Sequence, residues 1–127
     1  MALSERQALE LWRRTINLCV RSDLPDLSAR QQAILMNVSL TRGPHTVRGL
    51  AESLDIAKPA VTRALDTLTR HELVRRVRDE KDLRNVFIER TQGGLTYLRT
   101  LAAQILSAEQ GKSDPVAVQD RDTAQVA

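Results

Sequence analysis

A short cluster of donor side chains could bind anionic oxygens and the edges of nucleic-acid bases. Lys58, Pro59, Thr62 and Arg63 lie within "KPAVTR", which carries two cations and one hydroxyl over less than two turns of a helix. Ammonium, guanidinium and hydroxyl groups all donate hydrogen bonds, and phosphates and base edges accept them. The chemistry that these residue types favour is therefore recognition of an anionic polymer, and the elements around them must hold them on one surface.

The surrounding stretch predicts the helix that would present these donors. At about 100° per residue, one side of a helix from Lys58 to His71 gathers apolar side chains, which are Val61, Ala64, Leu65 and Leu68. An α-helix fits the major groove of duplex DNA, where the first two turns touch bases. An ordinary amphipathic helix with a solvated polar face explains the same pattern, so this stretch alone leaves both interpretations open.

The start of this helix carries a second signal. Pro59 suits a first turn, whereas Ala57 is a poor N-cap and offers no side-chain acceptor to the first amides. An uncapped helix start, with its positive dipole end and the charge of Lys58, predicts a phosphate site.

A further donor is predicted at the tip of a β-hairpin. The segments "LVRRVRD" and "NVFIERT" are rich in β-branched residues and roughly alternate in polarity, so they predict two strands joined by the charged tip "DEKDLR". Arg84 could enter a minor groove, and Asp82 could hold its guanidinium through a charge-assisted bond. A solvated hairpin with a weak surface ion pair is the alternative.

The other elements complete a winged helix. The capping-box spacing of Ser and Gln predicts helices that start at Ser4 and Ser28 and end near residue 21 and Leu40. "TRGPH" is expected to be a loop, and Thr46 to cap a short helix that forms a helix-turn-helix with Lys58–His71. The predicted fold is mostly α with a small β-hairpin: a winged helix-turn-helix over about residues 28–92, within a single domain of residues 1–110.

The last helix is expected to begin after Thr91 and to end near Glu109. Gly93 and Gly94 in its first turn predict either fraying or a close backbone approach. Residues 111–127 are polar and without sustained periodicity, which predicts a disordered tail.

The amino-acid composition limits the kinds of binding partner that are expected. The net charge is +3, and the basic residues are 16 Arg against 3 Lys, which favours forked contacts with phosphate and guanine. Trp12, Phe87 and Tyr97 are the only aromatic residues, too few for stacking on single-stranded bases. No stretch is long and apolar enough for a membrane span, and no signal peptide is visible. One cysteine cannot form an internal disulfide, so a cytoplasmic location is expected.

Residues 50–94 resemble the multiple-antibiotic-resistance repressor (MarR) family. The shared parts are the "LA…L.I.KP.VTR.LD.L" helix pair, the D-x-R motif at Asp82 and Arg84, and "TxxG" before the last helix. The resemblance implies a dimeric transcription regulator, most often a repressor, that binds palindromic duplex DNA and dimerises through its N- and C-terminal helices. It assigns base reading to Lys58, Pro59, Thr62 and Arg63, and minor-groove contact to Arg84 oriented by Asp82.

This sequence departs from the family at several positions. Asp55 stands where Gly is common, so a left-handed Asp is expected there. Ala57 replaces a frequent Ser, and Arg90 replaces an apolar residue. The C-terminal arm is short, so dimerisation would rest on residues 4–21 and 95–109. The remaining arginines of the winged helix are assigned to phosphate contacts: Arg42, Arg48, Arg70, Arg75, Arg76 and Arg78.

Four residues are candidates for an effector cleft or a dimer core: Trp12, Arg14, Cys19 and Tyr97. Relatives in the family respond to small aromatic acids, so a small-molecule effector is a candidate partner, and dimer core is the favoured interpretation for Trp12. Cys19 is interpreted as a small buried hydrophobe, with peroxide sensing through its thiolate as the alternative.

No enzyme, cofactor or metal is expected. His45 and His71 lack zinc-ligand spacing, and no catalytic set or nucleotide loop is evident. The favoured function is therefore a sequence-specific, double-stranded DNA-binding regulator. The rival is a winged-helix module that binds a protein, such as an RNA-polymerase subunit or another regulator, with DNA contact secondary.

Overall fold

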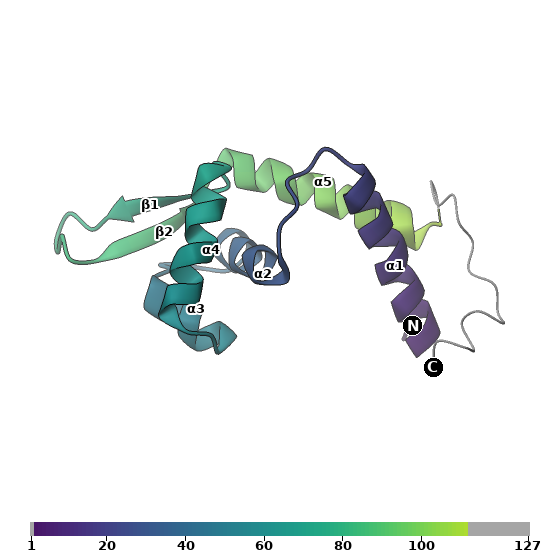
Figure 1. Cartoon of the computed structure of the whole chain (residues 1–127), viewed down its shortest axis with the longest axis horizontal. Helices are drawn as coiled ribbons and strands as arrows, with labels where there is room; N and C mark the ends of the chain where they lie inside the picture. The colour runs from purple at the N-terminus through teal and green to yellow at the C-terminus, as the bar shows by residue number, and fades with distance from the viewer. Residues whose placement is uncertain (1, 112–127) are drawn as a thin grey trace. The chain divides into compact units, whose positions relative to one another are not determined.

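The structure is a computed structural model in which residues 2–111 are described. Within them the chain forms five helices and two strands (Figure 1): α1 (Glu5–Arg21), α2 (Ala29–Leu40), α3 (Val47–Leu54), α4 (Lys58–Arg70), β1 (Val74–Arg78), β2 (Val86–Arg90) and α5 (Gln92–Glu109). The predicted mostly helical fold with one small hairpin is confirmed. Apart from Gly111, the tail predicted as disordered lies outside the described residues.

The chain divides into two compact units. One is the winged helix, residues 27–99, and the other combines residues 2–26 with residues 100–111. The helix α5 therefore contributes its first part to the winged helix and its last part to the unit that contains α1. Within residues 2–111, no helix has the combination of length and apolar character that crossing a membrane requires.

Side-chain caps set the first two helix starts, as predicted. At α1 the Ser4 hydroxyl accepts from the Gln7 amide at 3.1 Å, and the Gln7 side chain accepts from the Ser4 amide at 2.9 Å. Ser28 and Gln31 repeat this box at α2, with distances of 3.2 and 2.9 Å. Each reciprocal pair satisfies two amides that a helix start otherwise leaves without partners.

A left-handed residue joins α3 to α4. Asp55 has φ 53° and ψ 49°, which confirms the conformation expected where other sequences carry Gly. The following amide, that of Ile56, donates to the Ala51 carbonyl at 3.1 Å and closes the end of α3. The turn is thereby fixed, and with it the direction in which α4 leaves α3.

The core of the winged helix anchors α4. All four residues predicted for its buried side are buried: Val61, Ala64, Leu65 and Leu68. They pack where α4 contacts α2, α3 and β1, together with the fully buried Ile34 and Leu35 of α2. Because burying a Leu, Ile or Val side chain stabilises a fold by about 1.5–3 kcal/mol, this stripe fixes which face of α4 remains in solvent.

The two strands form an antiparallel hairpin. The register pairs Val74 with Arg90 and Arg76 with Ile88. The segment predicted as the loop "TRGPH" adds one bridge, because the Ile88 amide donates to the His45 carbonyl at 2.8 Å. The loop interpretation was incomplete here, since a single bridging residue has too little pattern to be recognised in a sequence.

The two glycines at the start of α5 lie close to the backbone of another segment, which is the close approach expected from the sequence and not fraying. A Cβ on Gly94 would lie 2.3 Å from the Leu73 carbonyl oxygen, and one on Gly93 would lie 2.7 Å from that of Glu72. The Thr91 hydroxyl caps the helix by accepting from the Gly94 amide at 2.9 Å and also donates to the Glu72 carbonyl at 2.8 Å. These contacts tie α5 to the turn between α4 and β1.

Candidate nucleic-acid interface

The predicted base-reading residues lie together on the solvent side of α4. Lys58, Pro59, Thr62 and Arg63 are all exposed, while Val61 and Ala64 between and after them are buried. The buried stripe of the helix therefore orients the donors outward from the core. The structure brings these four residues onto one face of the first two turns, which are the turns that a recognition helix places against bases.

The first turn of α4 has no side-chain cap. Ala57 is extended, with φ −69° and ψ 147°, and Pro59 has no N–H to satisfy. The Ala60 amide donates to the Ala57 carbonyl at 3.0 Å, whereas the Lys58 amide has no partner among the described residues. A phosphate here would meet one free amide, the positive end of the helix dipole and the Lys58 ammonium group. This helix start therefore offers a phosphate one amide donor, fewer than the three that a helix start with all its first amides free would offer.

The wing tip holds Arg84 in a defined orientation. Its Nε donates to Asp82 Oδ1 at 3.1 Å and its Nη2 to Asp82 Oδ2 at 3.2 Å, although the Arg84 side chain is 90% exposed. The expected Asp82–Arg84 contact is therefore present. The Arg84 side chain, helped by the Arg84 amide, lowers the pKa of the Asp82 carboxyl below its ordinary value. Because the carboxylate engages Nε and Nη2, Nη1 of the guanidinium keeps its donors for another acceptor.

Backbone bonds shape the rest of the tip. The Asn85 amide donates to the Asp82 carbonyl at 2.9 Å, and the Asp79 amide donates to the Asn85 carbonyl at 3.0 Å. The guanidinium of Arg78 donates to the Leu83 carbonyl at 2.9 Å. These bonds close the loop that carries Arg84, so its position depends on the hairpin rather than on a free chain.

The three arginines of β1 that were predicted to contact phosphates all have partners within the protein. Arg75 pairs with Glu89 at 3.0 Å, Arg76 pairs with Asp66 at 2.8 Å, and Arg78 binds the wing-tip carbonyl. Sequence analysis missed Asp66 as a functional candidate, because nothing in its spacing relates it to a strand ten residues later. Each guanidinium has five donors, so these bonds reduce its capacity for phosphate without abolishing it.

The other three predicted phosphate contacts lie on α3, α4 and the segment before α3. Arg48 pairs with Glu52 at 3.3 Å, and both side chains are mostly exposed. The side chains of Arg42 and Arg70 are exposed and form no hydrogen bond or ion pair within residues 2–111. Arg42 and Arg75 also line a groove of about 600 Å³, together with Pro44, Phe87 and Arg90.

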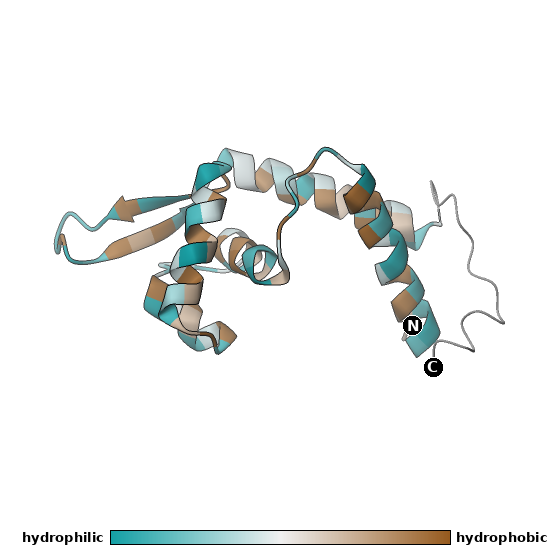
Figure 2. Ribbon diagram, viewed as in Figure 1, coloured by the Kyte–Doolittle hydropathy of each residue, from teal (hydrophilic) through white to brown (hydrophobic). Residues whose placement is uncertain are grey.

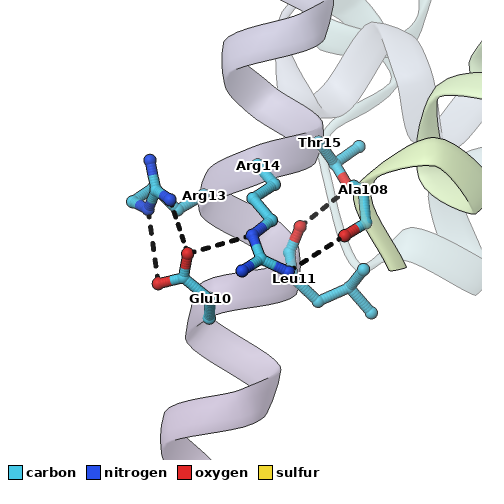
Figure 3. Close-up of polar contacts among 6 residues, drawn as sticks. All are labelled: Glu10, Leu11, Arg13, Arg14, Thr15 and Ala108. Atoms are coloured by element: carbon cyan, nitrogen blue, oxygen red, sulfur yellow. Dashed lines mark hydrogen bonds and ion pairs between the residues drawn. The ribbon is translucent and has the colours of Figure 1, made fainter. Parts of the chain in front are cut away.

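The unit that contains α1 holds three of the four candidates for an effector cleft or dimer core. Arg14 Nη1 donates to the Ala108 carbonyl at 3.3 Å, and its Nε lies 3.1 Å from Glu10 Oε1 (Figure 3). Cys19 Sγ lies 3.0 Å from Gln104 Oε1, so both residues connect α1 to the end of α5. Trp12 is 57% exposed, while Tyr97 is 6% exposed and belongs to the winged-helix unit.

Burial raises the pKa of the Cys19 thiol. The thiolate that peroxide chemistry requires is therefore disfavoured, and the structure gives the sensing alternative no support. A groove of about 600 Å³ lies nearby and includes Leu3, Arg6, Leu11, Arg14 and Ala108, but not Trp12, Cys19 or Tyr97. Over residues 2–111, no group of three or more His, Cys, Asp or Glu side chains is placed to hold a metal ion.

Comparison with known sequence families finds a match to the winged helix. The sequence model of the MarR family matches residues 27–86, which include α2 to β1, the wing tip and the first residue of β2. No curated protein sequence gives a significant match.

Solved structures share the fold at low sequence identity. An S. aureus MepR F27L mutant bound to an oligodeoxyribonucleotide is 18% identical, with a TM-score of 0.70 over 94% of this chain and 85% of that one. YusO from Bacillus subtilis is 19% identical, with a TM-score of 0.69 over 95% and 83%. CouR from Rhodococcus jostii RHA1 bound to p-coumaroyl-CoA is 20% identical, with a TM-score of 0.59 over 95% and 81%.

Proposed function

We propose that the protein, whose residues 27–86 match the MarR-family model, is a transcription regulator that binds specific double-stranded DNA sites as a homodimer and represses transcription in the cytoplasm. One observation carries the proposal: α4 exposes Lys58, Thr62 and Arg63 on a single face next to a helix start without a side-chain cap. A face made only for solvent needs no such concentration of donors in its first two turns. The similarity to a DNA-bound MepR supports the same conclusion.

In this proposal α4 enters the major groove. Lys58 and Arg63 donate to base edges, Thr62 contributes its hydroxyl and methyl groups, and Pro59 packs close to the bases. Arg63 is the best candidate for a forked contact with guanine, because its guanidinium is exposed and planar. Arg84 enters the adjacent minor groove, where the pairing with Asp82 already fixes its orientation.

Phosphate contacts would come first from the arginines whose side chains have no partner in the described part of the chain. Arg42 and Arg70 are proposed as such contacts, with Arg48 beside them because its pair with Glu52 is exposed and weak. Arg75 and Arg78 would have to share their donors between the protein and the DNA backbone. These contacts fix register and affinity but do not distinguish sequences.

An exposed apolar stripe supports the homodimer. Leu9, Trp12, Ile16 and Val20 follow at helical spacing along α1 and all remain exposed, Val20 to 77%. Figure 2 shows hydrophobic and hydrophilic segments alternating along α1. Ile105 and Leu106 of α5, in the same unit, are exposed as well. A stripe of this kind marks a protein interface, and a second copy of the chain would give two α4 helices for the two halves of a palindrome.

A small-molecule effector is also proposed, on the basis of one ligand-bound structural neighbour and one groove. The CouR structure holds an aromatic acyl thioester, and the groove beside Arg14 offers about 600 Å³, which is the size of a site for a drug-sized ligand. Trp12 and Cys19 lie on the same helix and would act with the dimer rather than within this groove. Tyr97 is proposed as a residue that lines the effector cleft.

The salt dependence of duplex binding tests the proposal against the protein-binding alternative. A regulator that neutralises several phosphates should lose affinity steeply as salt rises, with a log–log slope of about −0.9 for each phosphate. The measurement is a titration of a labelled duplex at several salt concentrations. A nearly flat slope with no preferred sequence would instead identify a module that binds another protein.

A further inference from the structure

Arg76 links the hairpin to the candidate recognition helix. Its Nη2 donates to Asp66 Oδ1 at 2.8 Å and lies 3.4 Å from the carbonyl oxygen of Thr62. Asp66 and Thr62 are four residues apart on α4, so one guanidinium spans a full turn of that helix. Among the described residues, these are the hydrogen bonds that join the side chains of the hairpin to α4.

The position of Arg76 in the strand explains this reach. It pairs with the buried Ile88, so its side chain leaves the hairpin on the face that contributes to the core. Arg75, one residue earlier, pairs with Glu89 on the opposite face. The two neighbouring arginines are therefore separated by the sheet, and one of them is directed to α4.

We propose that Asp66 and Arg76 form a positioning pair that sets the wing relative to α4, so that Arg63 and Arg84 engage the same DNA site together. The inference rests on the proposed function and deepens it. It also reassigns Arg76, which the sequence suggests as a phosphate contact. Thr62, whose carbonyl approaches the same guanidinium, is a proposed base-contacting residue, which brings the link within one turn of the reading surface.

The energetics favour an effect on binding rather than on folding. The Arg76 and Asp66 side chains are 33% and 57% exposed, and exposed pairs add little to the stability of a fold. Two recognition elements that are already correctly spaced lose less entropy when they bind one ligand. The Asp66–Arg76 pair is thus expected to affect DNA affinity mainly when α4 and the wing are both bound.

The charge of Asp66 makes the test decisive. A carboxylate on a DNA-facing helix repels phosphate, so Asp66→Asn should strengthen binding if that repulsion is its main effect on DNA. If Asp66 positions the wing, the same substitution should weaken binding to the preferred site by about tenfold and leave binding to a scrambled duplex unchanged or slightly stronger. The two interpretations predict opposite signs.

A matched control lies on the other face of the hairpin. Glu89→Gln removes the carboxylate of the Arg75 pair, which lies on the opposite face of the hairpin from the Arg76–Asp66 pair. It should leave preferred-site affinity unchanged or slightly stronger. Thermal unfolding of both variants should match that of the parent, which separates a positioning effect from a loss of folding.

The coupling between the two DNA-binding elements gives the final readout. In the parent, Arg84→Ala should weaken preferred-site binding by about tenfold, whereas in an Asp66→Asn background the same change should cost about twofold. Equal losses in the two backgrounds, or tighter binding by Asp66→Asn, would overturn the inference. Arg76→Met supplies a second check. If it weakens the affinity for all duplexes alike and reduces the salt slope by about one phosphate, Arg76 is a phosphate contact and the inference is overturned. A parent that does not distinguish the two duplexes would instead refute the proposed function itself.

Discussion

The guanidinium of Arg84 lies against the carboxylate of Asp82, with Nε 3.1 Å from Oδ1 and Nη2 3.2 Å from Oδ2. Asp82 Oδ1 also accepts from the Arg84 amide at 3.1 Å, so one carboxylate fixes both the backbone and the side chain of the exposed arginine. An arginine held in this way loses less rotamer entropy when it enters a groove. The pair therefore serves the orientation of Arg84 more than the stability of the fold.

This pair predicts a specific titration. The pKa of Asp82 is lowered in the folded protein, mainly by the Arg84 side chain. A carboxyl with a lowered folded pKa favours the folded pairing above its unfolded pKa, and that contribution disappears as the pH falls through the folded pKa. The pair should thus remain intact at neutral pH and be lost only in acid.

The measurement is NMR titration of the Asp82 carboxyl. The pKa should lie below the ordinary Asp value of about 3.9 and should return towards it in Arg84→Ala. A pKa that is the same in both proteins would show that the two side chains do not interact in solution.

Two arginines of α4 should behave differently when removed. Arg63→Ala should relax sequence preference by about 1–3 kcal/mol, because a forked contact with one base is lost. Arg70→Ala, in the last turn of the same helix, should weaken all duplexes alike and reduce the salt slope by about one phosphate. Competition titrations with single-base variants of the site measure both the sequence preference and the overall affinity. If Arg63→Ala leaves the sequence preference unchanged, Arg63 is not one of the residues that contact bases.

Substitutions at Ala57 separate helix stability from phosphate binding. Ala57→Asp and Ala57→Ser both supply the missing N-cap and should stabilise the protein by up to about 1 kcal/mol. Only the Asp variant places a negative charge where a phosphate is expected, so its DNA affinity should fall well below that of the Ser variant. Denaturant unfolding and duplex titration measure the two effects, and equal affinities would show that this helix start does not meet the DNA.

The exposed stripe of α1 should control association. Trp12→Asp is expected to convert a dimer into a monomer, because it places a charge within an apolar interface. Leu40→Asp replaces another exposed hydrophobic residue, at the end of α2, and should leave association unchanged. Sedimentation of both variants measures this, and a dimer that survives Trp12→Asp would place the interface elsewhere.

Local chemistry explains what could be predicted from the sequence. The capping boxes at Ser4 and Ser28 set helix starts within a few residues, and the spacing of Val61, Leu65 and Leu68 identified the buried side of α4. Asp55 was expected to be left-handed and is. Each of these features depends on residues within one or two turns, where spacing alone determines which groups can meet.

Features that depend on packing between distant elements could not be predicted. The Arg76–Asp66 contact requires the face on which the hairpin meets α4, and the His45–Ile88 bridge requires the path of the preceding loop. Four of the six predicted phosphate contacts have internal partners: Arg75, Arg76 and Arg78 have them through the fold of the hairpin, and Arg48 has one on its own helix. The apolar residues of α1 were recognised by their spacing, but a sequence cannot show whether its own chain covers them.

Selection of bound sequences from random duplex DNA tests the central claim most directly. We predict enrichment of a palindrome whose half-sites lie about one helical turn, or about 10 base pairs, apart, because a dimer presents two α4 helices to one face of the duplex. Enrichment of no sequence at all, or binding that resists rising salt, would contradict the account of this protein as a sequence-specific DNA-binding regulator.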